Sequence, residues 1–392
     1  MIRIRTLDDL DVRGKRVFYR VDYNVPLEDG RITDATRIEE TLPTLKLLRD
    51  RGAAVILASH LGRPKCERKP KYSLAPVRER LASLIGAPVQ WADDVNVDTS
   101  KLQPGELLLI ENLRFYPGEE SNDRGFAEQL RKLADVYVND AFGASHRAHA
   151  SIDALPKLFG PDRSAGGLLL VKEIEFLQKI TNVSDRPFVA LLGGAKIAGK
   201  IEPLEALVNL ADVVLIGGGM ANTFLASKQI RMGGSLVDRD SIDIARRILE
   251  GKHRANVMLP VDVVVGDSLD QPVKIETVAV SHGLSDDQKA FDIGPKTIAA
   301  YDAEMKKART IFWNGPMGVF EKEAFAKGTM AMARAVAESD AISVVGGGES
   351  VEAVKASGFA SRITHISTGG GASLEFISGA TLPGIAVLEV KG

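Results

Sequence analysis

The second half of the sequence contains four glycine clusters, and each directly follows a short apolar run. They are LLGGAKIAGK (191–200), IGGGMAN (216–222), VVGGGES (344–350) and STGGGAS (367–373). An apolar run that ends in glycines and opens a helical pattern is typical of a strand leading into a helix N-terminus. Backbone N–H groups and the helix dipole converge there and favour an anion such as phosphate. The clusters therefore indicate parallel α/β units and a phosphorylated ligand in this half.

Strand-like and helix-like segments alternate along the whole chain. Most of the apolar runs are short and continuous, as expected when helices cover both faces of a parallel sheet. The expected strands are 16–21, 54–58, 107–110, 136–138, 188–192, 213–216, 261–265, 310–313, 342–345 and 363–366. A chain of 392 residues also exceeds what one hydrophobic core usually supports. We predict an α/β protein with two doubly wound parallel-sheet (Rossmann-like) domains joined by a helix and hinge.

The boundary between these domains is expected near 166–186. There GLLLVKEIEFLQKI reads as one amphipathic helix, and the polar segment TNVSDRP ends it before a new strand begins. We place a first domain at 1–170 and a second at 171–379. Nineteen of the 27 arginines stand at or before Arg186, whereas 25 of the 37 glycines stand at or after Gly193. This division favours a small anionic substrate in the first domain and a nucleotide in the second.

Composition excludes several other classes of protein. The formal net charge of −2 gives no reason to expect nucleic acid or membrane as a partner. Cys66 is the only cysteine, which excludes an internal disulfide and a multi-cysteine metal site. The N-terminal residues show no apolar signal region, and no stretch approaches the ~20 apolar residues of a membrane helix. The expectation is a cytoplasmic enzyme.

Basic side chains follow successive strands of the first domain. His60 and Arg63 follow the second expected strand, Arg114 the third, and the run SHRAHA (145–150) the fourth. A single such residue is more often a surface or capping residue, but several at one sheet edge predict a basic pocket. Asp22, Tyr23 and Asn24 follow the first expected strand, and from the pattern alone a local turn stabilised by Asp and Asn is the favoured interpretation.

The glycine clusters fit neither of the common nucleotide motifs. A P-loop requires Ser or Thr after Gly194–Lys200, and Ile201 stands there. A dinucleotide fingerprint requires a third glycine, and Asn222 and Val351 stand in its place. An NAD-dependent dehydrogenase on the same fold is therefore the weaker alternative.

The glycine clusters also carry two lysines and a carboxylate, which are side chains suited to a nucleotide and its metal ion. Lys196 and Lys200 suit nucleotide phosphates, and the GGGES loop adds Glu349 and Ser350 as oxygen donors for Mg²⁺. This combination favours ATP as the nucleotide.

The order of ten sequence motifs along the chain is a further informative feature. RVDYNVPL, TDATRI, SHLGRP, ENLRFYPGEE, SHRAHAS, GGAKIAGK, IGGGMANTFL, FWNGPMGVFE, GGGES and STGGGASLEF cover nearly the whole chain. In this order the sequence resembles the phosphoglycerate kinase family. The resemblance implies reversible phosphoryl transfer between 1,3-bisphosphoglycerate and ADP, giving 3-phosphoglycerate and ATP in glycolysis by domain closure. It also implies Mg²⁺, a monomer, and a C-terminal tail (380–392) that packs back on the first domain.

The resemblance assigns residues to three groups. The substrate 3-phosphoglycerate would be bound by Asp22, Tyr23, Asn24, Arg37, His60, Leu61, Gly62, Arg63, Arg114 and Arg147. The nucleotide would be bound by Lys200, Asn314, Glu321, Gly347, Gly348, Glu349 and Ser350, with Glu349 also holding the metal. Catalysis would fall to Arg37, Lys196, Gly347 and Gly370.

One residue departs from the family pattern. The usual GGGD[ST] is GGGES in this sequence, so Glu349 replaces a metal-binding aspartate. The extra methylene puts the metal affinity in question, because Mg²⁺ tolerates little error in ligand position. A decayed kinase that only binds its ligands is a further alternative, but every basic residue of the pattern is retained.

Overall fold

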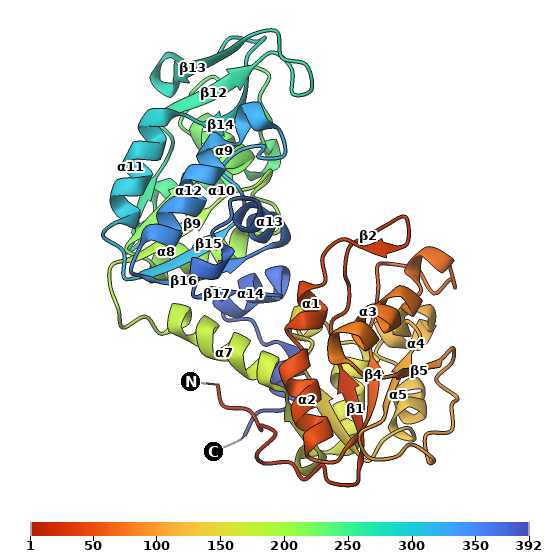
Figure 1. Ribbon diagram of the computed structural model, residues 1–392. Coiled ribbons are helices and arrows are strands. Elements are labelled where there is room, and N and C mark those ends of the chain that lie inside the picture. The colour runs from red at the N-terminus through yellow and green to blue at the C-terminus, as the bar shows by residue number, and fades with distance from the viewer. Residues whose placement is uncertain (1, 391–392) are drawn as a thin grey trace. The chain divides into compact units, whose positions relative to one another are not determined.

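The computed structural model describes residues 2–390, and the chain divides into two compact units. Unit 1 consists of the residues up to Glu175 together with those from Thr381 onward, and unit 2 of Phe176–Ala380. The division falls inside helix α7 (Leu168–Thr181). Each unit contains its own parallel six-stranded sheet (Figure 1). The predicted fold class, two parallel-sheet α/β domains, is therefore confirmed.

The sheet of unit 1 is parallel throughout, and its central strands are almost entirely buried. Its strands, in order across the sheet, are β5 (Val89–Ala92), β6 (Leu107–Ile110), β4 (Ala54–Ala58), β1 (Arg16–Arg20), β7 (Val136–Asn139) and β8 (Ser164–Gly166). The chain leaves β1 toward β4 and later returns to β7 on its other side, which makes the β1–β7 junction a topological switch point. Arg20 lies opposite both Ala58 and Asn139, so the residues after these three strands emerge at one edge.

Short helices cover this sheet, and their ends follow from the local sequence. The helices are α1 (Thr36–Glu39), α2 (Leu42–Asp50), α3 (Ala75–Ile85), α4 (Pro117–Glu120), α5 (Arg124–Arg131), α6 (Leu155–Phe159) and α15 (Pro383–Ala386). Asp123 caps α5 by accepting a 2.7 Å hydrogen bond from the amide of Phe126. Gly86 ends α3 in the left-handed conformation at φ 66°. A small hairpin, β2 (Leu27–Glu28) and β3 (Arg31–Ile32), precedes α1.

The segment from Thr381 onward is integral to unit 1. The amide of Val390 donates to the carbonyl of Arg3 at 2.9 Å, and the amide of Arg5 donates to the carbonyl of Leu388 at 3.0 Å. Gly384 donates through its amide to the carbonyl of Ser145 at 2.9 Å. These bonds attach the segment to Arg3 and Arg5, which precede β1, and to the loop after β7. The last two residues of the predicted tail lie outside the described residues.

The sheet of unit 2 has the strand order of a doubly wound nucleotide-binding fold. In order across the sheet the strands are β11 (Asn256–Met258), β10 (Val213–Ile216), β9 (Phe188–Leu192), β15 (Thr310–Asn314), β16 (Ile342–Gly346) and β17 (His365–Ile366). All of these pairs are parallel, and the order reverses between β9 and β15. In open α/β sheets ligands bind at the carboxyl ends of the strands beside such a reversal.

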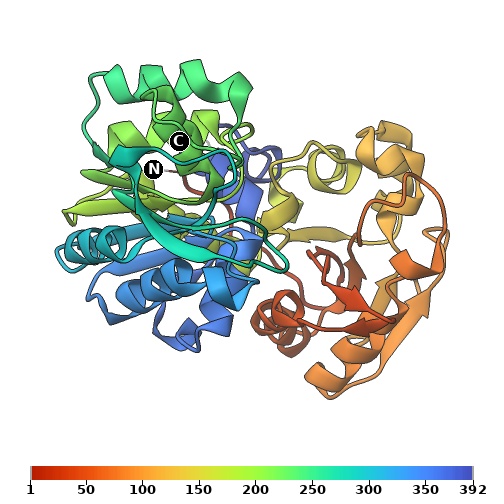
Figure 2. The same ribbon diagram turned by 90° about the horizontal axis from the view of Figure 1, so that it is seen from above.

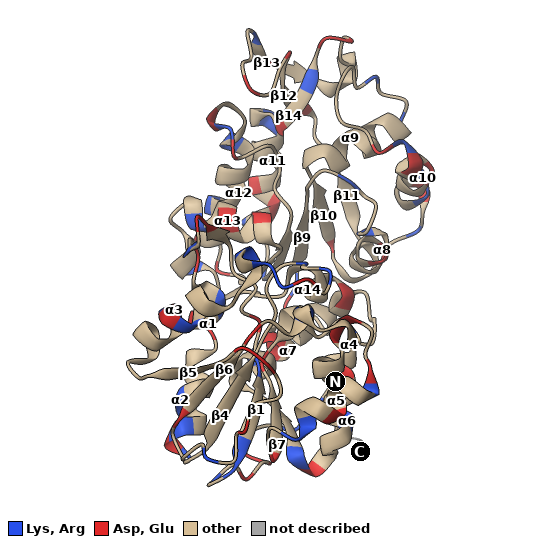
Figure 3. Cartoon of the chain, turned by 90° about the vertical axis from the view of Figure 1, so that its right-hand side faces the viewer, with Lys and Arg blue, Asp and Glu red and all other residues tan. Residues whose placement is uncertain are grey.

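The helices of unit 2 lie on both faces of its sheet. They are α8 (Ile201–Leu210), α9 (Gly218–Ser227), α10 (Ile242–Glu250), α11 (Pro295–Met305), α12 (Lys327–Glu338), α13 (Gly348–Ala356) and α14 (Gly370–Ile377). In Figure 2 the earlier helices of the unit (green) lie on one side of the sheet and the later ones (blue) on the other. The helix α10 carries both acidic and basic residues, which Figure 3 marks in red and blue.

One strand prediction was wrong in its pairing. The run 261–265 forms β12 (Asp262–Gly266), but this strand belongs to a separate antiparallel sheet with β13 (Ile275–Ala279) and β14 (Lys289–Ile293). Its two partners follow it closely in the chain, so short connections can place them antiparallel beside it. Among residues 2–390, no helix is long and apolar enough to cross a membrane.

Candidate functional site

A group of polar and cationic side chains gathers around Asp22 in unit 1, at the carboxyl ends of β1 and β4. Both carboxylate oxygens of Asp22 lie 3.0 Å from Nη1 of Arg37. Nε2 of His60 lies 3.9 Å from Oδ1 of Asp22, and the amide of Asn24 donates to the same oxygen at 3.1 Å. The sequence interpretation of Asp22 and Asn24 as a local turn is therefore correct as well, but the turn holds an ion pair.

Gly62 connects this group to the third strand end. Its amide donates to Oδ1 of Asn24 at 2.8 Å, and its carbonyl accepts a 2.8 Å hydrogen bond from Nη1 of Arg114. The guanidinium of Arg114 also lies 3.4 Å from the carboxylate of Glu120. These contacts bring Asp22, Asn24, Arg37, His60, Gly62 and Arg114 into one continuous network.

Arg20 is a further member of the network that the sequence analysis missed. It is fully buried, and Nη2 lies 3.3 Å from Nδ1 of His60. Its Nε donates to Oγ of Ser151 at 2.7 Å, and Ser151 in turn donates to Glu119 at 2.6 Å. The third guanidinium nitrogen of Arg20, Nη1, donates to the carbonyl of Val21. The available signal was a charged residue inside the otherwise buried strand RVFYR.

Burial and charge set the protonation states of this site. Burial opposes ionisation of Asp22, but the neighbouring Arg37, with His60 and Arg20, lowers the pKa of its carboxyl to about 2. Burial holds the pKa of His60 well below its usual range, so this imidazole is neutral at pH 7. Arg37 therefore supplies the main stabilising charge for Asp22. Arg20, Arg37 and Arg114 each lie within 4 Å of a carboxylate, so the excess positive charge that attracts anions comes from the exposed Arg63 and Arg147.

Two predicted cations lie at the exposed margin. Arg63 and Arg147 are both exposed, and Nε of Arg147 donates to Nε2 of His146 at 3.2 Å. The nearby His149 is buried, and burial together with the surrounding arginines lowers the pKa of its ring to about 3. His149 is thus an uncharged member of an otherwise basic neighbourhood.

The side chains of Tyr23 and Leu61 point into the core. Tyr23 is fully buried, and its hydroxyl lies 2.9 Å from Oγ1 of Thr41, while its amide donates to Oγ of Ser59 at 2.8 Å. Leu61 is also buried and packs with the same core. At these two positions only the backbone is available to a ligand.

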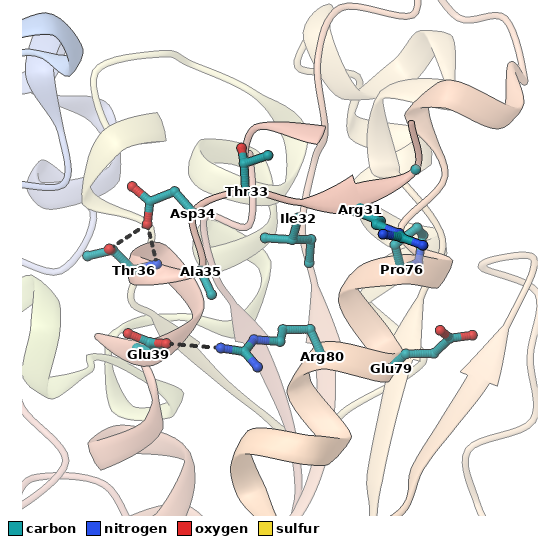
Figure 4. Close-up of a pocket in the computed structure, with 11 residues that line it drawn as sticks. Arg31, Ile32, Thr33, Asp34, Ala35, Thr36, Glu39, Pro76, Glu79 and Arg80 are labelled. Atoms are coloured by element: carbon teal, nitrogen blue, oxygen red, sulfur yellow. Dashed lines mark hydrogen bonds and ion pairs between the residues drawn. The ribbon is translucent and has the colours of Figure 1, made fainter. Parts of the chain in front are cut away.

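The short helix α1, which carries Arg37, is anchored from several sides. Oδ1 of Asp34 accepts hydrogen bonds from the amide and the hydroxyl of Thr36 at 2.8 and 2.5 Å. At the other end of the helix, Glu39 lies 3.5 Å from Nη2 of Arg80 on α3. Figure 4 displays both contacts on the wall of a polar hollow of about 590 Å³ between β3, α1 and α3. A helix of four residues is not stable alone, so these contacts and the buried Ile38 fix its position.

A second candidate site is an apolar cavity of about 320 Å³ in unit 2. It opens at the reversal of strand order between β9 and β15. Its lining includes backbone of the first two glycine clusters and of the NGPMG segment, together with Val263, Leu269, Phe291 and Val319. Glu321 and Glu349 also border it. An apolar cavity of this size with glycine-rich walls fits the base of a nucleotide.

Close backbone packing explains the glycines of this cavity. A Cβ atom on Gly193 would lie 2.1 Å from the carbonyl oxygen of Pro316, and one on Gly219 would lie 2.5 Å from that of Ala195. The loops after β9, β10 and β15 can therefore approach one another only because these positions lack side chains.

The two lysines of the first cluster differ in their surroundings. Nζ of Lys200 donates to the carbonyl of Gly193 at 2.9 Å. Burial lowers the pKa of Lys200, and the nearby carboxylate of Glu349 opposes this shift. Lys196 is exposed. Lys200 is thus held in the loop, and Lys196 extends into solvent.

The remaining predicted residues meet around the ends of β15 and β16. Nδ2 of Asn314 donates to the carbonyl of Gly346 at 2.9 Å, and Oγ of Ser350 accepts from the amide of Gly315 at 2.5 Å. Gly347 has φ 94°, a conformation that favours glycine. A Cβ on Gly370 would lie 3.0 Å from Cα of Gly347, so the third and fourth glycine clusters touch.

Asp292 is a cavity residue that the sequence analysis missed. Its carboxylate accepts from the amides of Gly328 and Ile293 at 2.7 and 2.9 Å. Burial nevertheless raises the pKa of this carboxyl to about 7, and the two amides only partly oppose the shift. No motif marks this residue, because its position depends on the antiparallel sheet that the sequence analysis did not predict.

The donors in unit 2 fit a divalent ion that is bound mainly through a nucleotide. Glu349 is exposed in the first turn of α13 and close enough to Lys200 to influence its pKa. Within residues 2–390 no group of three or more His, Cys, Asp or Glu side chains is placed to hold a metal. Mg²⁺ in kinases commonly takes one or two carboxylates and completes its shell with phosphates and water. One carboxylate beside a phosphate site meets that requirement.

Comparisons with known proteins agree on one family. Residues 7–380 match the sequence profile of the phosphoglycerate kinase family. A phosphoglycerate kinase of Moorella thermoacetica is 51% identical over 98% of this chain and 99% of its own length, and one of Desulforudis audaxviator is 48% identical with the same coverage. The solved structure of the Coxiella burnetii enzyme superposes with a TM-score of 0.88 at 38% identity, covering 98% of this chain and 99% of that one. The Pyrococcus horikoshii enzyme gives 0.87 at 33% identity, covering 98% of each chain.

Proposed function

The chain belongs to the phosphoglycerate kinase family, and on that premise we propose how its two units share the reaction. The reaction is the reversible transfer of a phosphoryl group between 1,3-bisphosphoglycerate and ADP, which gives 3-phosphoglycerate and ATP in glycolysis. The observation that carries the proposal is a difference between the units. Unit 1 presents buried and exposed cations at its sheet edge, and unit 2 presents an apolar cavity with glycine-rich walls.

In this proposal residues 1–170 and 380–392 form the domain for 3-phosphoglycerate. Its phosphate and carboxylate are anions, and guanidinium groups bind such oxygens in pairs. The ligands are the side chains of Asp22, Asn24, Arg37, His60, Arg63, Arg114 and Arg147 and the backbone of Tyr23, Leu61 and Gly62. Asp22 keeps Arg37 oriented, which is supported by the two 3.0 Å contacts. Arg20 does not contact the ligand in this proposal; it positions the His60 ring through the 3.3 Å contact with Nδ1.

Residues 171–379 form the nucleotide domain. The base and ribose occupy the apolar cavity, with Glu321 at the ribose. Lys200, Asn314, Gly347, Gly348 and Ser350 border the phosphates. Their support is the convergence of the glycine-rich loops at the strand reversal, where doubly wound sheets bind ligands. Gly370 offers a further backbone amide at the N-terminus of α14.

The chemistry asks for position and charge rather than for a protein nucleophile. An acyl phosphate is already reactive, so catalysis consists of aligning donor and acceptor and neutralising the transferring oxygens. Arg37 and Lys196 supply this positive charge, with the backbone of Gly347 and Gly370. In-line transfer requires contact between the two substrates, so the proposal includes movement of the units during turnover.

Mg²⁺, the cellular location and the assembly state belong to the proposal too. When bound, Mg²⁺ neutralises the β- and γ-phosphates, and Glu349 is the side chain that would hold it. The enzyme acts in the cytoplasm as a monomer on small molecules, without nucleic acid or membrane partners. A net charge of −2 supports the last point, since it gives a polyanion no general attraction.

A coupled assay of ATP-dependent consumption of 3-phosphoglycerate tests the activity. Arg37→Ala tests the site, with Arg31→Ala as the matched control, because Arg31 is an exposed arginine of the neighbouring hairpin. The expected result is turnover by the wild type and by Arg31→Ala, and a loss of roughly 10²–10³ in kcat for Arg37→Ala. Normal turnover by Arg37→Ala would contradict the proposed role.

A further inference from the structure

The loop between Leu61 and Tyr72 in unit 1 carries an unusual concentration of positive charge. Its nine residues, RPKCERKPK (63–71), contain five cationic side chains and one carboxylate, in a chain whose formal net charge is −2. All of these cationic side chains are exposed. We name the segment 63–71 the cationic loop.

Specific contacts hold together the two ends of the cationic loop, at Leu61 and Tyr72. Nδ2 of Asn112 donates both to the carbonyl of Leu61 at 2.7 Å and to the carbonyl of Tyr72 at 2.9 Å. The ring of Tyr72 packs over Gly62, where a Cβ atom would lie 2.4 Å from Cε1. Both ends of the loop are therefore held beside Gly62. The loop and its lysines are thus anchored next to the network around Asp22.

The positive charges of the loop are only partly neutralised. Lys69 pairs with Glu67 at 2.7 Å, and Arg68 lies 3.4 Å from Asp94. Throughout residues 2–390, no carboxylate pairs with Lys65 or Lys71, although Lys71 lies 5.0 Å from the Tyr72 ring centroid. These two ammonium groups are therefore available to an anion that approaches from solvent.

The backbone keeps Lys65 near the candidate site. Lys65 follows Arg63 by two residues, which limits their Cα atoms to about 7.6 Å apart. Lys65 and the next residue both adopt positive φ, 55° and 62°, so the chain turns tightly there and does not extend away. Lys71 directly precedes Tyr72, whose ring packs over Gly62. The site binds its ligand through Gly62 and Arg63 in the proposed function, so the backbone of both lysines is held beside its margin.

We infer that the cationic loop is an outer collecting surface for the phosphorylated glycerate substrate, acting before the substrate reaches the network around Asp22. This inference rests on the proposed function. Lys65 and Lys71 attract the substrate anion through solvent and leave the bound complex to Arg37 and its neighbours. Clefts lined by one sign of charge raise both the encounter rate and the local concentration of oppositely charged ligands. The loop thus affects the affinity for the glycerate substrate and leaves the chemical step unchanged.

The expected size of the effect follows from Coulomb attraction with screening. Two lysines ~10 Å from a substrate with roughly three negative charges correspond to roughly a twentyfold change in affinity at ~10 mM salt, where the Debye length is about 30 Å. At about 0.15 M salt the same lysines correspond to about threefold.

The test compares two double variants that remove equal charge from unit 1. Lys65→Gln with Lys71→Gln removes the charge from the loop. Lys101→Gln with Lys132→Gln is the control, because both lysines are exposed and precede β6 and β7, at the opposite edge of the parallel sheet. Steady-state kinetics with 3-phosphoglycerate and ATP are measured from about 10 mM to about 0.5 M salt.

For the loop variant we expect an unchanged kcat and an unchanged KM for ATP. Its KM for 3-phosphoglycerate should rise roughly twentyfold at low salt and converge with the wild type at high salt. Equal salt profiles for the two double variants would overturn the inference, and so would an equal rise in both KM values. A wild type without turnover of 3-phosphoglycerate would instead remove the proposed function, before any variant is compared.

Discussion

The ion pair between Asp22 and Arg37 makes a specific prediction about stability and pH. Asp22→Asn keeps the size of the side chain and removes its charge. Asp22 is almost completely buried, and both of its oxygens lie 3.0 Å from Nη1 of Arg37. The substitution therefore leaves the guanidinium of Arg37 without its carboxylate partner, whereas Arg20 keeps Glu119 at 3.9 Å, and we expect unit 1 to lose stability.

The size and pH range of this loss follow from the pKa of Asp22. Its pKa falls from 3.8 to about 2 on folding, and burial opposes this fall while Arg37 drives it. Because the folded pKa is the lower one, the carboxylate stabilises the folded state above the unfolded pKa and loses this effect as the pH falls through about 2. The difference corresponds to about 2.5 kcal/mol at pH 7 and to about half of that at pH 3.

The two tryptophans allow the measurement to be confined to unit 1. Trp91 lies in β5 of unit 1 and Trp313 in β15 of unit 2. With fluorotryptophan incorporated, the ¹⁹F NMR signal of Trp91 reports unit 1 alone during urea unfolding. We expect the difference in unfolding free energy between wild type and Asp22→Asn to shrink between pH 4 and pH 3. A control is Asp11→Asn, which removes an exposed carboxylate and should follow the wild type.

A difference that stays constant from pH 7 to pH 3 would refute the reasoning. It would mean that the loss comes from altered packing or from neutral hydrogen bonds, which do not titrate in this range.

Four further predictions concern single residues. Tyr23→Phe should leave kcat and both KM values unchanged in steady-state assays and should lower the unfolding free energy by about 1 kcal/mol, because it removes only the bond to Thr41. Lys196→Ala should lower kcat by roughly 10²–10³ with little change in ADP affinity, measured by kinetics and calorimetry. Gly193→Ala should abolish ADP binding in calorimetry, since its Cβ would lie 2.1 Å from the carbonyl oxygen of Pro316. Glu349→Asp should lower the Mg²⁺ concentration needed for half-maximal activity and for ADP binding; superimposable magnesium titrations would mean that the longer side chain has no cost.

The parallel architecture was predictable because strands that are buried on both faces of a sheet are continuous apolar runs in the sequence. β4, β6 and β9 are such runs, and each lies where a strand was predicted. The short edge strands β5, β8 and β11 were not predicted. Two of them mix polar with apolar residues, and β8 is the small-residue segment SAG, so no apolar run marks them. The run 261–265 was predicted as a strand but not as antiparallel, since pairing depends on segments that come later in the chain.

The candidate site was predictable to the extent that motifs carry it. The pattern identified Arg37 and Asp22, but it could not show that they form one ion pair. Arg20 and Asp292 were not predicted. The only local signal for Arg20 was its place inside the apolar run of β1, and no local signal marks Asp292. Tyr23 was assigned by position, and only the structure places its side chain in the core.

The hydrogen bonds that attach the segment after Thr381 to Arg3 and Arg5 have a consequence for biosynthesis. Unit 2 is one continuous stretch, so all of its residues have left the ribosome before unit 1 has received its last piece. The usual order, in which the N-terminal domain finishes first during translation, is therefore not open to this chain. A nascent chain that stalls before Leu388 lacks the partner of the Arg5 amide, leaving the first unit unfinished for chaperones or proteases to recognise.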